Sequence, residues 1–371
     1  MPPVTIDGTN GITTPMYNGS ITANAVTPSV NMKNRIINGA MVIDQRNAGA
    51  SVTNTSADLV FPVDRTNIYG TVSSKFTAQQ NAGSVTPPVG FTNYLGCTSS
   101  SAYTVGASES FWVQQRIEGF NTADLQWGTA NAKTVTLSFW VRSSLTGTFG
   151  GSFQNSASDR SYPYSYTISS ANTWEYKTIT VAGDTTGTWI GATNGMGIKI
   201  FWGLGSGATV SNTAGAWAAG TFTSATGATS VVGTNGATFY ITGVQLEVGS
   251  TATSFDYRPY STELMLCQRY CRTYGDGLLG IASGSTQVFL CPTFAPQMRA
   301  TPTVTLSDTS VKISDNFATD IVSTGSTLPD TTISAFGGRI AVNGFTGLTT
   351  ARVYEAYDNT NGFFFVISAE L

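Results

Sequence analysis

The sequence contains no histidine among its 371 residues. Histidine is the side chain that most often serves as a general base and as a metal ligand near neutral pH. Its absence therefore excludes Ser-His-Asp and Cys-His catalytic arrangements, and any zinc site that needs an imidazole ligand. Hydrolysis of a glycan by paired carboxylates stays open, because that chemistry needs no histidine.

Charged side chains are also scarce. Asp, Glu, Lys and Arg together make up 11% of the residues, less than half of the roughly 25% that is usual in globular proteins. The 18 Lys and Arg residues are spread thinly and the formal net charge is -3, so we expect neither nucleic acid nor an anionic membrane as a partner. A surface made of hydroxyl and amide groups favours protein assembly or sugar binding instead.

Long hydrophobic runs are missing too. The longest apolar stretches, such as Phe363 to Ile367, have the length of a strand and fall far short of the ~20 residues of a membrane span. The first residues, MPPVTIDGTN, lack the basic and apolar segments of a signal peptide. We therefore expect a chain that is made in a cytoplasm and does not insert into a membrane.

Cysteine is rare and scattered. The four residues, at positions 97, 267, 271 and 291, predict reduced and mostly buried thiols. Cys267 and Cys271 are four residues apart, which could imitate half of a metal site. Without histidine or a second cysteine pair their spacing favours packing, and we expect no metal and no cofactor.

Glycine is abundant, with 40 residues, and frequent Thr, Ser and Asn make the composition typical of short strands joined by tight turns. Asn38-Gly39 lies between two apolar runs and predicts a hairpin. Further strand-like segments follow at short spacing, over residues 111–117, 134–141, 174–181, 197–202 and 238–246. We predict an all-β fold whose main part, residues 35–258, is an antiparallel jelly-roll β-sandwich.

Three other regions surround this predicted sandwich. Residues 1–34 alternate Thr, Asn, Gly and Pro with isolated apolar residues, so we expect an extended N-terminal docking arm that a partner subunit orders. Residues 259–275 are predicted to form a connector helix. Residues 276–371 are predicted to form a second, C-terminal β-sandwich domain. No repeat of fixed period is present, which disfavours a long parallel β-helix.

The predicted helix carries a stripe at three-four-three spacing, made of Leu264, Cys267, Cys271 and Tyr274. Such heptad-like spacing is typical of a seam between parallel helices. We therefore expect a homotrimer with these four residues at the oligomer interface. The alternative is that the stripe packs onto the sandwich of its own chain.

Strand alternation suggests which aromatic side chains face outward. In the segment 135–142, Trp140 and Arg142 share the face opposite to the apolar one, and in 111–118 Trp112, Gln114 and Arg116 do the same. A tryptophan beside planar polar groups suits a sugar, because the ring stacks on a pyranose and the polar groups bind its hydroxyls. We take these five residues as candidate glycan ligands. The alternative is that the tryptophans pack under a loop, a sheet or another subunit.

Two further sets of residues have weaker functional readings. Trp127, Trp189 and Trp217 lie in Gly/Thr-rich segments, where aromatic rings either read a glycan or anchor loops. The carboxylates that could serve hydrolysis are Asp159, Glu175, Asp184, Glu247 and Asp256. Each lies near a turn or a basic residue, so we expect turn capping and no catalysis. A structural calcium ion is conceivable in such a fold, but no DxDxDG-type loop supports it.

The sequence contains, in this order, the segments NRIINGAMVIDQRNAG, Val63-Asp64-Arg65, VQQRIEG, KTVTLSFWVRSS, ATFYITGVQLEVGSTATSFDYRPYSTELMLCQRYCRTY and QMRATPTV. These segments and their order resemble those of tailed-bacteriophage tail-fibre and virion-appendage proteins. The resemblance covers roughly residues 34 to 304, and its most specific part runs from VQLEVG to CQRYC.

This resemblance implies a jelly-roll domain similar to carbohydrate-binding modules, followed by a C-terminal β domain, and it implies no enzymatic activity. The function we predict is therefore that of a tail-fibre-like structural protein of the virion. Its arm docks to other virion proteins and its body recognises a host surface glycan non-covalently. The alternatives are a head fibre or capsid decoration protein, and a tailspike glycan depolymerase that uses paired carboxylates.

Overall fold

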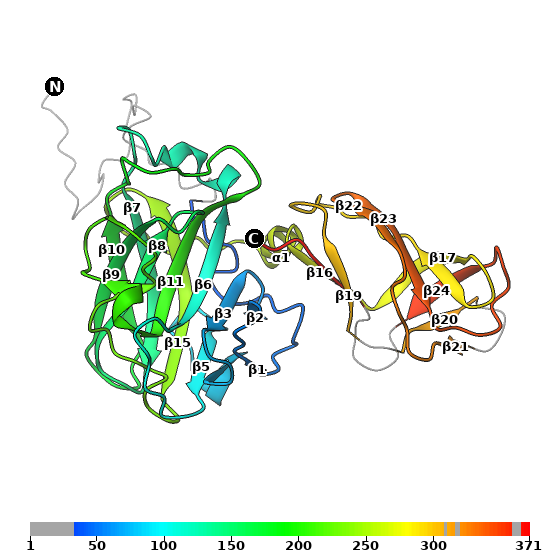
Figure 1. Cartoon of the computed structure of the whole chain (residues 1–371), viewed down its shortest axis with the longest axis horizontal. Coiled ribbons are helices and arrows are strands. Elements are labelled where there is room, and N and C mark those ends of the chain that lie inside the picture. Colours follow the sequence, from blue (N-terminus) through cyan, green and yellow to red (C-terminus); the bar gives the residue numbers. More distant parts are fainter. Residues whose placement is uncertain (1–32, 308–309, 316–319, 358–364) are drawn as a thin grey trace, which may run out of the picture.

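The computed structural model describes residues 33–307, 310–315, 320–357 and 365–371. They form a large β-sandwich and a smaller C-terminal β unit, which lie side by side with one short helix between them (Figure 1). The predicted docking arm, residues 1–34, lies outside the described residues except for Lys33 and Asn34. The predicted fold class is confirmed, since the chain is nearly all β, with antiparallel sheets and a jelly-roll sandwich.

The sandwich consists of two antiparallel sheets. One has six strands, in the order β1 (Val52–Thr53), β4 (Phe76–Gln80), β5 (Leu95–Ser99), β15 (Thr238–Val248), β7 (Val135–Ser143) and β10 (Glu175–Val181). The other has seven, in the order β13 (Ala218–Ala219), β9 (Arg160–Ile168), β8 (Gly147–Gln154), β11 (Met196–Ser206), β6 (Ser110–Glu118), β3 (Thr66–Gly70) and β2 (Val60–Val63). All five strand-like segments predicted in this region are strands.

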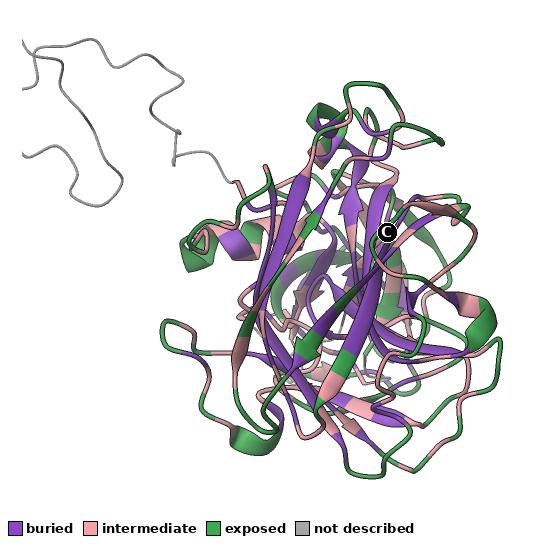
Figure 2. Cartoon of the chain, turned by 90° about the vertical axis from the view of Figure 1, so that its left-hand side faces the viewer, coloured by how far each residue is buried: buried purple, intermediate pink, exposed green. Residues whose placement is uncertain are grey.

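Short elements complete the sandwich at its rims and over its seven-stranded sheet. They are the 3-10 turns η1 (Ala82–Ser84), η2 (Gly119–Asn121), η3 (Ala123–Leu125) and η4 (Ala208–Val210), and the parallel pair β12 (Ser211–Asn212) and β14 (Ser224–Ala225). Glycine lets β14 approach the sheet closely, because a Cβ on Gly150 would lie 2.5 Å from the Ser224 hydroxyl. Figure 2 shows buried residues along the strands and exposed ones in the connecting loops.

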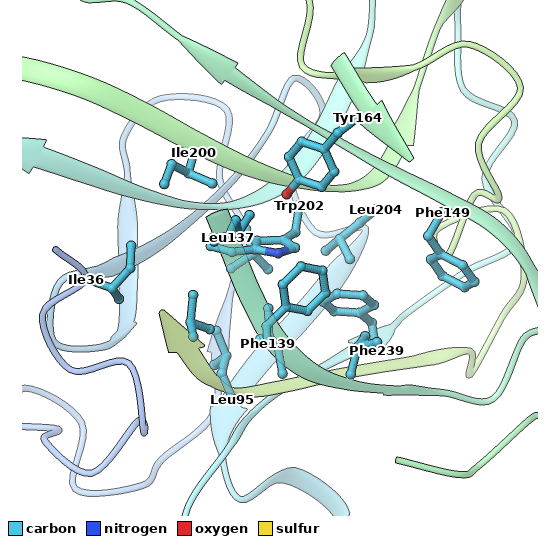
Figure 3. Close-up of a cluster of buried hydrophobic side chains, with 14 of the residues drawn as sticks. Ile36, Leu95, Leu137, Phe139, Phe149, Tyr164, Ile200, Trp202, Leu204 and Phe239 are labelled. Atoms are coloured by element: carbon cyan, nitrogen blue, oxygen red, sulfur yellow. The ribbon is translucent and has the colours of Figure 1, made fainter. Parts of the chain in front are cut away.

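The sandwich core is rich in aromatic side chains. Phe139 meets Trp202 and Tyr166 edge-to-face, with ring centroids 6.0 and 5.1 Å apart, and Figure 3 shows Phe149 and Phe239 beside them. Burial of each such side chain stabilises the fold by about 1.5–3 kcal/mol. Tyr164 donates its hydroxyl to the Phe201 carbonyl at 2.6 Å, so its polar atom is satisfied inside the core. The alternation in segments 111–118 and 135–142 predicts correctly which side of each strand faces the core, since Phe111, Val113, Leu137 and Phe139 belong to the core cluster.

The predicted hairpin at Asn38-Gly39 is a turn without a strand ladder. Asn38 has a positive φ of 60°, and its amide bonds to the backbone of Ile43, at 2.8 Å as donor and 3.0 Å as acceptor. These side-chain bonds replace the ladder that the apolar flanks would otherwise form. Ile36 then joins the sandwich core, while Ile37 and Ile43 join a small cluster at the helix.

The predicted connector helix is shorter than expected. Helix α1 spans Tyr260–Gln268, and the next residues form strand β16 (Cys271–Tyr274), which pairs with β25 (Phe365–Ser368). Cys271 and Tyr274 therefore lie in a strand, so the continuous helical seam is wrong. Leu264 and Cys267 pack against Ile37, Ile43 and Tyr270 of the same chain, which is the alternative that the pattern left open. Residues 271–274 form a strand because they pair with β25, which lies more than 90 residues further along the chain. Local spacing of apolar residues does not reveal such a distant partner.

The C-terminal unit has two sheets around one core. The smaller sheet has the order β16, β25 and β19 (Thr303–Leu306). The larger has the order β21 (Ile321–Val322), β20 (Lys312–Ser314), β24 (Val353–Tyr357), β17 (Asp276–Ala282), β18 (Gln287–Leu290), β23 (Gly337–Asn343) and β22 (Thr331–Ser334). Leu290, Ile340 and Ile367 are fully buried in their shared core.

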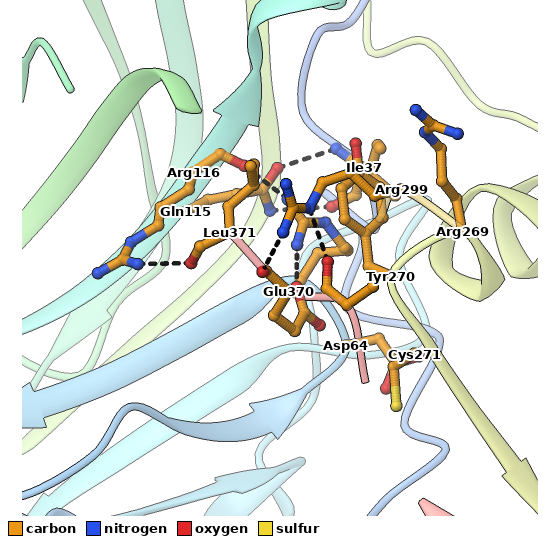
Figure 4. Close-up of polar contacts among 12 residues, drawn as sticks. Ile37, Asp64, Gln115, Arg116, Arg269, Tyr270, Cys271, Arg299, Glu370 and Leu371 are labelled. Carbon is orange, nitrogen blue, oxygen red and sulfur yellow. Dashed lines mark hydrogen bonds and ion pairs between the residues drawn. The ribbon is translucent and has the colours of Figure 1, made fainter. Parts of the chain in front are cut away.

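A polar network joins the two units (Figure 4). Glu370 pairs with Arg65 and, at 2.9 Å, with Arg46, while Arg116 donates to the Leu371 carbonyl at 2.5 Å. Arg299 donates to the carbonyl of Glu370 at 2.8 Å. The end of the described chain is thus held between sandwich and C-terminal unit by guanidinium groups, which form several directed bonds at once.

No helix in the described parts of the chain is long and apolar enough to cross a membrane.

Candidate functional site

An open groove of about 550 Å³ lies on the outer face of the six-stranded sheet. Its floor comes from β7, β10 and β15, and its walls from the loops 85–94 and 249–259. Aromatic and small polar side chains dominate the surface, which is lined by Val89, Phe91, Ser138, Trp140, Tyr176, Gly243, Ala252, Thr253, Ser254, Phe255 and Tyr257. The groove is therefore apolar at its faces and carries hydroxyl groups along its length.

Trp140 and Tyr176 form the floor. They are direct cross-strand partners on β7 and β10, and their ring centroids lie 5.4 Å apart. Trp140 is half-buried and Tyr176 is 42% exposed, so both keep ring surface toward solvent. Two adjacent aromatic faces of this kind offer a platform for the apolar face of a flat ring.

Three aromatic rings make one wall. Phe91 lies 5.1 Å from Phe255 and 5.5 Å from Tyr257, and the last two are 4.8 Å apart. The Tyr257 hydroxyl donates to the Gly90 carbonyl at 2.8 Å. The rings thus tie the loops 85–94 and 249–259 together and give the groove a fixed shape before any ligand binds.

Gly243 lies where wall and floor meet. It has a φ of +60° and stands at a register shift of β15 against β7, between Thr242 and Gln245. A Cβ at this position would lie 2.6 Å from the Phe91 ring and 3.1 Å from Trp140. Only glycine combines this backbone conformation with the close approach of both rings.

Buried polar side chains of β15 hold the loop 249–259 in place. Glu247 accepts hydrogen bonds from the Thr253 amide at 2.8 Å and its hydroxyl at 2.6 Å. Gln245 accepts from the Asp256 amide at 2.8 Å. Lys33 reaches the same loop from the start of the described chain and donates to the Ser254 carbonyl at 2.6 Å. Glu247 therefore acts as an anchor for the loop.

None of the described residues that line the groove is charged. The charged groups next to the lining make hydrogen bonds within the protein: Lys33 with Thr253 and Ser254, Glu247 with Thr253, Asp256 with the Asn34 amide, and Arg258 with the Ile36 carbonyl. The lining therefore offers a ligand rings, hydroxyls and backbone groups, and the Lys33 ammonium group beside it is already bonded to Thr253 and Ser254.

The five predicted glycan ligands fall on two opposite sheets. Trp140 lines the groove. Arg142, two residues along β7, lies outside the lining; its Nε donates to the Asn172 carbonyl at 2.9 Å and its guanidinium lies 5.2 Å from the Tyr240 ring. Trp112, Gln114 and Arg116 lie on β6 of the other sheet, so the structure does not bring the five residues into one site.

The expectation of an exposed platform on β6 is wrong for Trp112 and Gln114. Trp112 is 7% exposed, stacks on Tyr69 at 5.1 Å and meets Phe201 edge-to-face at 5.2 Å. Gln114 is 1% exposed and accepts a bond from Arg116 at 2.7 Å, while Arg116 also binds the Leu371 carbonyl. Rings on the neighbouring strands β3 and β11 pack around Trp112, so this tryptophan is a packed side chain, as the alternative prediction has it.

The loop tryptophans anchor loops. Trp127, Trp189 and Trp217 pack edge-to-face on one another, with centroids 4.8–5.4 Å apart. Their indole N–H groups donate to the backbone carbonyls of Lys133, Thr186 and Ala182 at 2.7–3.2 Å. The cluster closes one end of the sandwich with its polar atoms satisfied.

The carboxylates considered for hydrolysis are engaged in hydrogen bonds. Asp184 pairs with Arg160 through both oxygens at 2.8 Å. Glu175 accepts two backbone amide bonds at 2.8 Å, which cap a turn, and the remaining contacts join Asp159 to Asn155, Glu247 to Thr253 and Asp256 to the Asn34 amide. The described residues contain no cluster of three or more His, Cys, Asp or Glu side chains that could hold a metal ion.

Most residues of the groove carry no distinctive local signal in the sequence. Tyr176 stands between the charged residues Glu175 and Lys177 on β10, and its pairing with Trp140 depends on the register of strands about 35 residues apart. Phe255 and Tyr257 stand in the segment SFDYRP, where the phenylalanine-x-tyrosine pattern before a proline was the available signal. Nothing local marks Phe91 as their partner.

No protein-family model matches the chain, and no curated protein matches it. Among solved structures, the enzymatically active domain of bacteriophage CBA120 tailspike protein 4 is similar over 58% of this chain and 22% of its own, with 11% identity and a TM-score of 0.31. A putative sugar binding protein from Bacteroides thetaiotaomicron is similar over 58% and 100%, with 12% identity and a TM-score of 0.31.

A family 11 carbohydrate-binding module from Clostridium thermocellum, in complex with a mixed-linked tetrasaccharide, is similar over 56% of this chain and 100% of its own. Its identity is 9% and its TM-score 0.26. This chain thus spans about a fifth of the tailspike domain and the whole of the two smaller proteins. At such low identities and scores, the chemistry of the groove has to be derived from its own residues.

Proposed function

We propose that the chain binds a neutral glycan, without cleaving it, in the groove above Trp140 and Tyr176. The observation that carries the proposal is the groove itself: an open, preformed cleft floored and walled by five aromatic rings and bordered by hydroxyl groups. Pyranose rings have one apolar face and a rim of hydroxyls, so they match this alternation of ring and hydroxyl.

The charge of the lining supports a neutral ligand. A carboxylate, sulfate or phosphate on a bound sugar would lose hydration without gaining a cationic partner, which costs free energy. Binding should therefore depend little on salt concentration, because no ion pair is screened. A panel of neutral and acidic oligosaccharides tests this directly: we expect neutral members to bind and their acidic counterparts to bind at least tenfold more weakly. Preferential binding of acidic glycans would overturn the proposal.

The non-covalent part of the proposal rests on the engaged carboxylates. Glu247, on β15, accepts hydrogen bonds from the loop 249–259 through both of its oxygens, and Asp256, within that loop, accepts one from the Asn34 amide. A general acid or a nucleophile needs a carboxyl group that reaches the glycosidic bond. Incubation with a bound polysaccharide should release no reducing ends; release would favour the depolymerase alternative instead.

A role in the virion rests on the sequence resemblance to tail-fibre and virion-appendage proteins. In this proposal residues 1–34 dock the chain to other virion proteins, and the groove reads a glycan on the host surface. A chain without residues 1–32 should still bind glycan but fail to enter particles. Antibody labelling of particles separates a tail location from the head-fibre or capsid-decoration alternative.

The homotrimer belongs to the same proposal. Its support is the resemblance, because the helical stripe that suggested it packs within one chain. Three copies would present three grooves, and simultaneous contacts raise the effective affinity for a repetitive surface polysaccharide.

A further inference from the structure

The outer face of the larger C-terminal sheet is apolar at its centre. On β17, Leu278 and Ala282 point into the core, while Leu279 and Ile281 point outward and are 58% and 51% exposed. The run LLGIA is thus apolar on both faces of the strand. Strands that are apolar on both faces are usually covered on both sides, yet the described residues leave one side of β17 open.

The exposed residues form a row across neighbouring strands. Ile281 is the register partner of Val353 on β24 and of Phe289 on β18. Val353 is 54% exposed and Phe289 is half-buried. Leu279 lies beside this row. A contiguous apolar area on an otherwise hydroxyl-rich surface marks an interaction site.

Opposite charges flank this apolar area at one height along the strands. Glu355 is the register partner of Leu279. Cys291 donates its amide to the Leu279 carbonyl at 3.3 Å, and Arg339 directly precedes Ile340, the register partner of Leu290, so it stands opposite Cys291. The Arg339 guanidinium lies 4.4 Å from the Phe289 ring and pairs with Asp330. The order across the sheet is therefore Glu355, Leu279, Cys291 and Arg339.

We propose that this face binds a second copy of the same chain, around a rotation axis parallel to β17 and β18. Rotation about such an axis leaves the position of every residue along the strand direction unchanged. It brings the β24 side of one copy to the β23 side of its neighbour. Glu355 of one chain then faces Arg339 of the next, while the apolar centres cover each other. The charge pattern is self-complementary, which favours a second copy over an unrelated partner.

This inference is independent of glycan binding, since the face lies in the C-terminal unit and the groove in the sandwich. It also places the oligomer interface on the larger C-terminal sheet, whereas the sequence predicted it on the helix. The two proposals can therefore fail separately: a monomer that binds glycan contradicts only the interface, and an oligomer that binds none contradicts only the groove.

Sedimentation of the full chain at micromolar concentration tests the interface. We expect a species of two or more chains for the wild type, and single chains for Ile281→Glu and for Leu279→Glu. Both side chains are exposed, so the variants should stay folded, as circular dichroism can verify. Thr167→Glu, at an exposed strand position of the sandwich, is the matched control and should sediment like the wild type. A monomeric wild type, or variants that associate normally, would overturn the proposal.

Reversal of the charges at Glu355 and Arg339 tests the proposed orientation of the two chains. Glu355→Arg and Arg339→Glu should each weaken association at least tenfold, and the double variant should associate more tightly than either single one. The cycle cancels effects inside one chain, such as the loss of the Arg339–Asp330 ion pair. Cys291 gives a second readout, because it is exposed whereas the other three cysteines are buried. Its alkylation should be slower in the oligomer than in the Ile281→Glu variant; equal rates would contradict the proposed face.

Discussion

Replacement of Trp140 by alanine should remove glycan binding while leaving the fold intact. The substitution deletes half of the aromatic floor, with which a pyranose would stack. Central aromatic residues of binding sites contribute about 2 kcal/mol or more, so the dissociation constant should rise roughly 30-fold. The side chain is half-buried and its ring meets Tyr176 at 5.4 Å, so the free energy of unfolding should fall by only about 1–2 kcal/mol.

Trp112→Ala is the matched control on the opposite sheet. This ring is 7% exposed and lies between Tyr69 and Phe201, so its loss should lower the free energy of unfolding by about 3–5 kcal/mol. Glycan affinity should not change in the fraction that is folded. Trp140→Ala should therefore lower the affinity with little loss of stability, whereas Trp112→Ala should lower the stability with no change in affinity.

Isothermal titration with a neutral oligosaccharide that binds the wild type measures the affinities, and urea denaturation measures the stabilities. If Trp140→Ala binds like the wild type, the groove is not the site. If it instead loses 3–5 kcal/mol of stability, the ring is part of the core and its effect on binding is indirect.

Three further predictions concern the groove and the junction. Gly243→Ala should lower glycan affinity at least tenfold and destabilise the protein by more than about 1 kcal/mol, because φ is positive and two rings crowd the site; unchanged titration and denaturation curves would contradict this. Burial raises the pKa of Asp64 to about 6, so the folded state binds the proton more tightly than the unfolded state does. Stability should thus rise by up to about 3 kcal/mol as the pH falls from above 6 to about 4, and Asp64→Asn should abolish this contribution in urea titrations at several pH values. Glu118→Ala should lower the free energy of unfolding by about 3 kcal/mol, because it leaves the Arg269 guanidinium, which donates to Glu118 at 2.5 Å, without its acceptor. Asp124→Ala, which breaks an exposed ion pair with Arg35, should lower it by less than about 1 kcal/mol.

Local sequence pattern is sufficient for strands and their faces. The alternation in 135–142 places Trp140 opposite Phe139 because side chains of a strand point to opposite sides at every second residue. The same argument places Trp112 opposite Phe111, and both assignments agree with the structure. Strand alternation and turn residues therefore predict the all-β class and most of the long strands.

Contacts between remote segments decide the rest. Trp112 and Trp140 look equivalent in sequence, but Tyr69 and Phe201 of neighbouring strands bury the first, while the second stays half-exposed. In the same way, the stripe from Leu264 to Tyr274 has helical spacing, yet β25 draws its second half into a sheet. The groove needs the register of β10 against β7 and the meeting of two loops about 165 residues apart, and neither is encoded by a local period.

Oxidative footprinting of the full chain, with and without a bound neutral oligosaccharide, tests the central claim most directly. The method reports, ring by ring, which side chains a ligand covers. The account predicts that the ligand protects Trp140, Tyr176 and Tyr257, and leaves Trp189 and Trp217 at the sandwich end unchanged. Protection of Trp189 and Trp217, with no change at Trp140 and Tyr176, would contradict the groove as the glycan site.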